Sequence, residues 1–287
     1  MLKTYHTITD LQHFLDKEKQ SGRSIGFVPT MGALHNGHIS LIEKSKKECS
    51  LTVCSIFVNP TQFNDPSDFK KYPRDIEQDK TLLEKNGCDC LFLPDVAEIY
   101  PSDDYRKINF DTGYLGKMLE GAYRPGHFVG MVAVVKRLFD IVMPDKAFFG
   151  QKDYQQCLIV KKMAEYYHLD LEIITCPTIR EKSGLAMSSR NLRLSGENRE
   201  KAAIIYKTLT WAEKEINRGT LSFEEIKDQA RAHFTGNGNF TVDYFDICSC
   251  DTLEPLSEKL NNERMVVIAA VWLGDVRLID NIIVSQV

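Results

Sequence analysis

The sequence predicts an α/β fold built on an open parallel sheet, followed by a smaller α+β domain. Three observations support this prediction. Short apolar runs at 25–28, 51–58 and 90–93 alternate with segments that have helical periodicity. Turns rich in glycine, proline or polar residues follow these runs. Beyond residue 191 the order changes to helical segments and then strand-like runs, as is typical of an α+β unit.

The elements can be assigned in chain order. Thr7 stands three residues before Asp10 and predicts a capped helix that ends near Gly22. The run 25–28, the helical segment from His38 and the run 51–58 form a strand–helix–strand unit, which predicts parallel pairing. The further elements expected are a helix at 75–86, a strand at 90–93, a helix at 129–142, a strand at 147–149, a helix ending near 167 and a strand at 171–175.

The last third of the chain is expected to form the second domain. Helices are predicted at 196–218 and 222–234, and strands at 241–248, 265–272 and 276–279. A polar loop rich in serine and arginine, 180–191, precedes them. We therefore place one domain at 1–184, and a smaller domain at 185–287 that could close over a ligand bound between them.

Composition limits the possible partners. The chain has 287 residues, 43% of them hydrophobic and 26% charged, which is typical of a soluble protein with a substantial core. A net charge of −4 argues against a broad nucleic-acid surface. The longest apolar run, 265–273, is far shorter than the ~20 residues of a membrane span, and residues 1–14 lack the apolar core of a secretory signal. We expect a cytoplasmic protein with no nucleic-acid or membrane partner, whose eight cysteines are reduced and structural.

The stretch 29–38, PTMGALHNGH, joins the first buried strand to a helix. Gly32 and Gly37 let a ligand approach the backbone, and His38 falls in the first helical turn, where amide groups favour an anion. In the alternative interpretation, His35 and His38 only cap and pack the helix. The pattern resembles the His-x-Gly-His signature of the nucleotidyltransferase superfamily that includes the class I aminoacyl-tRNA synthetases. This resemblance implies a Rossmann-like parallel sheet.

Polar residues also follow other predicted strands. Gln62 lies in the loop after 51–58, and Lys152 and Gln156 follow 147–149. Ligands of open parallel sheets bind beyond the carboxyl ends of the strands. A glutamine offers both a donor and an acceptor, and a lysine offers a point charge to a phosphate. Each of these residues, taken alone, also fits an ordinary solvated surface position.

Two further assignments stay open at this stage. Arg124, in the glycine- and proline-rich turn 121–128, could reach a phosphate. Glu77 and Asp79 could help to hold magnesium, although acidic residues on an exposed helix face are usually only solvated. We assign no metal ligand from the sequence.

Six motifs occur in an order that makes the resemblance specific. They are PTMGALHNGH, FVNPTQF, YPR, RPGHFVG, FGQKDYQQ and GLAMSSRN. In this order they resemble the pantothenate synthetase family, AMP-forming ligases of pantoate and β-alanine. The resemblance implies ATP contacts at Met31, Gly32, Ala33, Leu34, His35, Asn36, Gly37, His38, Gly150, Gln151, Lys152, Asp153, Ile179, Met187, Ser188, Ser189 and Arg190. It implies pantoate contacts at Gln62 and Gln156, with Gln62 also bordering β-alanine.

The resemblance also implies a mechanism. Pantoate attacks the α-phosphorus of magnesium ATP to give pantoyl adenylate, and β-alanine then displaces AMP. His38 is the residue expected to be catalytic, with His35, Lys152 and Arg190 as further pocket donors. Members of the family typically form homodimers, so the resemblance also implies a homodimer. Two rival hypotheses remain: a nucleotidyltransferase of the same superfamily that stops at a nucleotidylated product, and a nucleotide-binding module without catalysis.

Overall fold

The chain folds into two compact units. The computed structural model describes residues 1–64, 66–236, 238–259 and 263–285. One unit contains residues 1–151 and 156–177, and the other contains 152–155 and 178–287. The division therefore falls before Thr178, earlier than the boundary at 184 expected from the sequence. The physical reason is that the polar loop is bonded into the second unit, where Arg180 donates to the carboxylate of Asp280.

The first unit is built on a parallel sheet, as the sequence predicts. Every pairing in it is parallel, and each strand is registered against its neighbours over two to six residues. The strand order is β1 (Lys3–Tyr5), β4 (Cys90–Phe92), β3 (Leu51–Ile56), β2 (Ile25–Thr30), β5 (Lys146–Gly150) and β6 (Glu172–Cys176). Strand β1 was not predicted, because three residues are too few to show a periodicity.

The principal helices of this unit also follow the sequence prediction. They are α1 (Ile8–Gln20), α2 (Asn36–Glu48), α4 (Ile76–Lys85), α7 (His127–Val142) and α8 (Tyr154–Tyr166, whose first two residues belong to the second unit). Thr7 caps α1, accepting the amide of Asp10 at 3.2 Å. Helix α7 begins at His127, slightly earlier than expected. Shorter helical segments, α3 (Pro66–Lys71), α5 (Val96–Ile99), α6 (Glu120–Tyr123) and the 3-10 turn η1 (Pro60–Gln62), were not predicted.

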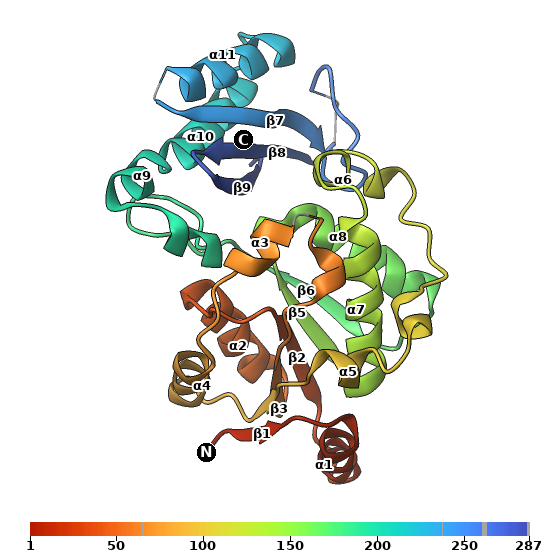
Figure 1. Cartoon of the computed structure of the whole chain (residues 1–287). Helices are drawn as coiled ribbons and strands as arrows, with labels where there is room; N and C mark the ends of the chain where they lie inside the picture. The colour runs from red at the N-terminus through yellow and green to blue at the C-terminus, as the bar shows by residue number, and fades with distance from the viewer. Residues whose placement is uncertain (65, 237, 260–262, 286–287) are drawn as a thin grey trace. The chain divides into compact units, whose positions relative to one another are not determined.

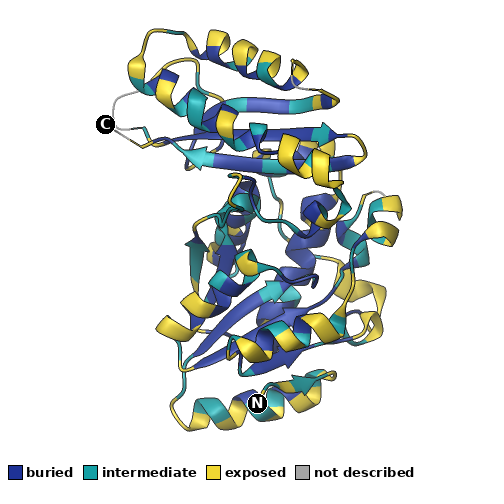
Figure 2. Ribbon diagram, turned by 90° about the vertical axis from the view of Figure 1, so that its left-hand side faces the viewer, coloured by how far each residue is buried: buried dark blue, intermediate teal, exposed yellow. Residues whose placement is uncertain are grey.

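Helices cover both faces of the parallel sheet. On one face, Leu41 and Ile42 of α2 and Leu83 of α4 join the core formed by strand residues such as Val28. On the other face, the ring of Phe139 in α7 lies 6.4 Å from that of Phe27. Phe27 and Val28 are consecutive and therefore point to opposite faces. Figure 1 shows α2 and α4 on one side of the strands and α7 on the other, and Figure 2 shows the buried strands in dark blue.

The direction of the strand order reverses between β2 and β5. From β2 the chain proceeds through β3 to β4 on one side, and it then returns to add β5 and β6 on the other side. In open α/β sheets such a reversal is where ligands bind, outside the carboxyl ends of the strands. The turn from Met31 follows β2, and Gln151 follows β5. Two of the predicted ATP-binding segments therefore start at the two strands that flank the reversal.

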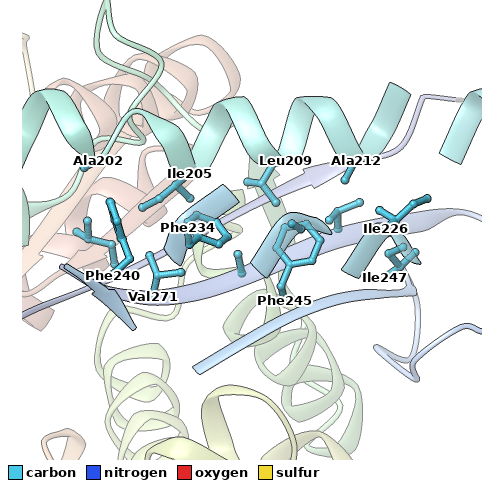
Figure 3. Close-up of a cluster of buried hydrophobic side chains, with 14 of the residues drawn as sticks. Ala202, Ile205, Leu209, Ala212, Ile226, Phe234, Phe240, Phe245, Ile247 and Val271 are labelled. Atoms are coloured by element: carbon cyan, nitrogen blue, oxygen red, sulfur yellow. The ribbon is translucent and has the colours of Figure 1, made fainter. Parts of the chain in front are cut away.

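The second unit packs two layers of structure. Its antiparallel sheet places β8 (Met265–Leu273) between β7 (Phe240–Ser249) and β9 (Val276–Ile283). Its helices are α9 (Gly196–Lys201), α10 (Ile204–Arg218) and α11 (Phe223–Thr235), so the single helix expected at 196–218 is divided in two. Figure 3 shows Leu209, Phe234, Phe245 and Val271 meeting in the core between helices and sheet. In the described part of the chain, no helix is long and apolar enough to cross a membrane.

Seven of the eight cysteines are buried. All eight lie in the described ranges, and none forms a disulfide. Burial raises the pKa of the Cys88 thiol to about 12 and that of Cys176 to about 11, so both stay protonated near neutral pH. Cys90 lies in β4 and Cys248 in β7, whereas Cys88 and Cys250 lie just outside the strands.

Candidate active site

The turn after β2 has an unusual backbone that is held by a buried carboxylate. Gly32 has φ of 80° and Ala33 has φ of 50°, a region that residues with a Cβ rarely adopt. The carboxylate of Asp79 in α4 accepts the amide of Ala33 at 2.9 Å and that of Leu34 at 2.7 Å. A Cβ at Gly32 would lie 3.0 Å from the same carboxylate. The turn therefore keeps its shape because Asp79 satisfies its amides at close range.

The expectation that Asp79 is solvated on an exposed face is wrong. Asp79 is only 2% exposed, whereas Glu77 is exposed and pairs with Lys80. Burial raises the pKa of Asp79, while the two backbone amides act in the opposite direction. The sequence did contain a signal for this position. Asp79 lies four residues before Leu83 and so shares the helix face that packs on the sheet.

The two histidines of the motif cap α2 reciprocally. The Nδ1 atom of His35 accepts the amide of Gly37 at 3.1 Å, and the Nδ1 atom of His38 accepts the amide of His35 at 3.3 Å. Their rings lie 4.1 Å apart. An Nδ1 atom that accepts a hydrogen bond leaves the proton of the neutral ring on Nε2. The two histidines therefore do cap the helix, and the same bonds select the neutral tautomer that carries its proton on Nε2.

The loop after β3 places Gln62 in a bonded framework. Asn59 is fully buried, and its side-chain oxygen accepts the hydroxyl of Tyr100 at 3.0 Å. Its amide nitrogen donates to the carbonyl of Gly130 in α7 at 3.1 Å. A Cβ at Gly130 would lie 2.1 Å from the carbonyl oxygen of Thr61, so only glycine lets α7 lie this close to η1. Gln62 itself is 9% exposed.

A chain of polar side chains reaches the backbone of Gln62. The Nδ1 atom of His127 lies 2.8 Å from the carbonyl oxygen of Gln62, and its Nε2 atom lies 3.2 Å from Nη1 of Arg124. A carbonyl can only accept and a guanidinium can only donate, so His127 is the Nδ1-protonated neutral tautomer. Arg124 in turn lies 3.5 Å from the carboxylate of Glu120. Arg124 therefore supports the Gln62 loop through His127, and its reach to a phosphate stays a prediction.

The remaining ATP-binding candidates of the second unit are bonded to one another. The amide of Met187 donates to the carbonyl of Ile179 at 2.9 Å. Ser188 caps the 3-10 helix Ser189–Arg193 by accepting the amide of Arg190 at 3.3 Å. The ammonium of Lys152 lies 3.2 Å from the carboxylate of Asp153. The second unit contains all of these candidates, residues 152, 153, 179 and 187–190, although they are distant in sequence.

The predicted site residues divide between the units as follows. The turn 31–38, Gln62, Gly150, Gln151 and Gln156 lie in the first unit. Gln156 lies in α8 and is partly buried. Sequence reasoning did not foresee the roles of Asp79, Asn59 and His127, which hold the turn and the loop without belonging to the predicted contact set.

The described residues offer no protein cage for a metal ion. They contain no group of three or more histidine, cysteine, aspartate or glutamate side chains that could hold one. Asp79, the candidate named from the sequence, directs both carboxylate oxygens at backbone amides.

An open parallel sheet, with a glycine turn and a histidine-capped helix at its reversal point, defines a Rossmann-like α/β protein of the class I aminoacyl-tRNA synthetase-like nucleotidyltransferase fold. The sequence model of one family, described as pantoate-beta-alanine ligase, matches residues 3–283. The chain belongs to this family.

Individual relatives agree with the family match. The pantothenate synthetase of Cytophaga hutchinsonii is 47% identical over 278 residues, which cover 97% of this chain and 98% of that protein. The crystal structure of pantothenate synthetase from Thermus thermophilus is 40% identical, with a TM-score of 0.90 over 99% of this chain and 100% of that one. The Francisella tularensis pantoate-beta-alanine ligase, complexed with beta-gamma ATP and beta-alanine, is 37% identical, with a TM-score of 0.80 over 99% and 98% of the chains.

Proposed function

We propose that the protein is an ATP-dependent ligase that condenses pantoate with β-alanine to give pantothenate, AMP and pyrophosphate. The observation that carries the proposal is the arrangement at the carboxyl end of β2. There a glycine turn held by Asp79 leads into a helix N-terminus capped by His35 and His38. Amides at a helix N-terminus, together with Nε2–H donors, suit the phosphates of a nucleotide. Membership of the ligase family supports the choice of substrates.

The reaction proceeds in two steps. In the first, a carboxylate oxygen of pantoate attacks the α-phosphorus of ATP, the bond from that phosphorus to the bridging oxygen breaks, and pyrophosphate leaves. In the second, the β-alanine amine attacks the acyl carbon, the acyl–oxygen bond to AMP breaks, and the amine loses a proton. Neither step requires a covalent enzyme intermediate. The protein's contribution is positioning and charge stabilisation.

Each proposed residue has a role that its surroundings permit. His38 and His35 donate from Nε2 to phosphate oxygens, because Nδ1 of each ring is an acceptor in the cap. Lys152 and Arg190 supply positive charge to the phosphates. Gln62 and Gln156 hold the carboxylate and hydroxyl groups of pantoate through amide donors and acceptors. The other ATP contacts are those of the turn 31–38 and the segments 150–153, 179 and 187–190.

Magnesium enters as part of the nucleotide substrate in this proposal. Bound magnesium usually keeps several waters and relies on phosphate oxygens, with few protein carboxylates. The absence of a three-ligand group among the described residues is compatible with that mode of binding.

The decisive experiment separates the half-reactions. Stoichiometric enzyme with ATP, magnesium and pantoate, but no β-alanine, should release about one pyrophosphate per active site and retain pantoyl adenylate, since a closed pocket excludes water. Later addition of β-alanine should liberate AMP and pantothenate. Free adenylated product without amine dependence would indicate a transferase, and no pyrophosphate would indicate a binding module. Pyrophosphate that appears only after β-alanine is added would overturn the stepwise mechanism.

We further propose a cytoplasmic homodimer. The support for the dimer is the family resemblance, and the support for the compartment is the biosynthetic reaction. Sedimentation equilibrium of the purified full chain tests the first, and fractionation of the source cells tests the second.

A further inference from the structure

Strand β9 carries two consecutive polar residues that are almost completely buried. Asp280 is 2% exposed and Asn281 is 1% exposed. Burying a carboxylate or an amide side chain costs free energy unless the group is hydrogen-bonded. The hydrogen-bond partners of Asp280 and Asn281 therefore explain why the fold tolerates them. Asn281 bonds to Lys152, a proposed ATP contact, and Asp280 bonds to Arg180, which adjoins the proposed contact at Ile179.

Asp280 holds the start of the polar loop through Arg180. The guanidinium of Arg180 donates to the two carboxylate oxygens at 2.6 and 3.0 Å. It also donates to the carbonyl of Gly184 at 3.2 Å, and it lies 3.8 Å from the ring centre of Tyr206. A bidentate arginine–carboxylate pair fixes orientation as well as distance. The loop is therefore tied to β9 at a defined angle.

Backbone bonds within the loop connect Arg180 to residues 187–190. Arg180 and Ala186 form an antiparallel bridge, and the amide of Met187 donates to the carbonyl of Ile179. The side chain of Asn191 donates to the carbonyl of Ala186 at 3.0 Å. A shift of Arg180 would thus move the backbone on both sides of Ser188.

Asn281 holds a second segment that is distant in sequence. Its side-chain nitrogen donates to the backbone carbonyl of Lys152 at 2.9 Å. The backbone N–H of Asn281 donates to a carboxylate oxygen of Asp280 at 2.8 Å, so the carboxylate also holds the main chain at Asn281. The bond from Asn281 to the Lys152 carbonyl fixes the main chain at Lys152. The side chain of Lys152, which is 16% exposed, extends from that point.

We infer that Asp280 and Asn281 are positioning residues for the nucleotide, which set the Lys152 turn and the 187–190 loop on one strand. This inference rests on the proposed function for the ligand. Neither residue is assigned a contact with substrate. They act by holding the two segments of the second unit in fixed relative positions, so that the charge of Lys152 and the backbone of 187–190 meet the same phosphates.

The test uses the full-length enzyme and the variant Asn281→Ala. We expect kcat/KM for ATP in pyrophosphate release to fall roughly tenfold, the effect of leaving one partly buried carbonyl unpaired, with KM for pantoate and β-alanine changed less than about twofold. Asn281→Asp, which keeps the size but places an acceptor against the Lys152 carbonyl, should lose at least as much. The control is Asn217→Ala, which removes an amide-to-carbonyl bond, to Ser285, at a more exposed place in the same unit.

Two results would overturn the inference. One is an ATP effect no larger than that of Asn217→Ala, and the other is an equal loss for all three substrates, which indicates a purely structural role. Calorimetric binding of ATP, which needs no turnover, is measured in parallel. If wild-type enzyme releases no pyrophosphate with pantoate, the proposed function fails. The inference is then still decided by whether Asn281→Ala binds ATP more weakly than the control.

The ion pair between Asp280 and Arg180 provides an independent test. Asp280→Asn removes the charge that orients Arg180 and should weaken ATP binding more than pantoate binding. Its control is Asp243→Asn in the same sheet, which breaks the carboxylate contacts to Arg277 at 2.7 Å and to Trp272 at 3.2 Å. Both variants lose stability, so only the substrate-specific difference counts. Equal ATP affinities in the two folded variants would contradict the role of Asp280.

Discussion

The carboxylate of Asp79 and the backbone amide of Leu34 lie 2.7 Å apart, although 45 positions separate them in the chain. This bond and the matching one to Ala33 join α4 to the turn after β2. Charge-assisted bonds to backbone amides are stronger than neutral ones. The backbone that precedes His35 and His38 therefore has its conformation set by a residue outside the motif.

Asp79→Asn tests this connection. An asparagine of the same size offers one acceptor oxygen, so one of the two amides loses its partner and the free energy of unfolding should fall by about 1–3 kcal/mol. ATP affinity should fall as well, because the turn loses its fixed shape. Urea denaturation and calorimetry provide the measurements. The exposed residue Glu77, changed to glutamine, is the control, and equal effects of the two substitutions would contradict the assignment.

The same residue predicts a pH dependence of stability. Burial raises the pKa of Asp79 above its ordinary value in the folded protein. Between the unfolded and folded pKa values the folded state binds more protons, so the contribution of Asp79 is greatest below the unfolded pKa and declines as pH rises through the folded one. The stability of wild type minus that of Asp79→Asn should therefore decrease with pH over this acidic window. A difference that increases with pH there would show that the amides outweigh burial.

Substitutions of His38 separate capping from catalysis. Asparagine can place an oxygen near the position of Nδ1, which keeps the cap, whereas glutamine can place a donor near Nε2. His38→Asn should retain stability and lose roughly two to three orders of magnitude in turnover, the usual effect of removing one preorganised donor. His38→Gln should lose about 1 kcal/mol of stability, typical of a lost cap, but retain more activity. Thermal unfolding and pyrophosphate release are measured for both. If His38→Asn turns over like wild type, the histidine is only a cap.

The two glutamines are expected to be specific for pantoate. Gln62→Ala or Gln156→Ala should weaken pantoate binding by about 1–3 kcal/mol, because a ligand group is left without its partner, and should leave ATP binding nearly unchanged. Titration calorimetry with each substrate measures this difference. Gln78, an exposed glutamine in α4, supplies the control variant Gln78→Ala. Unchanged pantoate affinity in both site variants would refute the assignment.

Gly130→Ala should displace the Gln62 loop, because α7 packs against η1 at this glycine. The new Cβ would lie 2.1 Å from the carbonyl of Thr61, so η1 must move away from α7. Overpacking of this kind typically costs about 1–3 kcal/mol. We expect lower stability and weaker pantoate binding, measured by denaturation and calorimetry. Gly196→Ala is the control, because nothing lies within 4 Å of a Cβ there. A Gly130→Ala protein with wild-type pantoate affinity would show that Gln62 does not depend on this contact.

The parallel sheet and its main helices could be predicted from the sequence, because the signals are local. Apolar runs such as 51–58, the cap at Thr7 and the glycine after 75–86 act within a few residues of the elements they define. The smaller antiparallel sheet was also predictable, since its central strand β8 is a continuous apolar run. Strand β1 was not, because three residues carry no period.

The motifs determined where a nucleotide site should be sought, and only the tertiary structure determined what holds it. His35 and His38 act on their own helix, so their capping follows from sequence spacing. Asp79, His127 and Asn281 act on backbone groups brought to them by the packing of other elements. A hydrogen bond to a distant main chain leaves no periodicity or composition in the sequence, since any residue can supply the backbone partner. For that reason the residues that position the site became evident only in the folded chain.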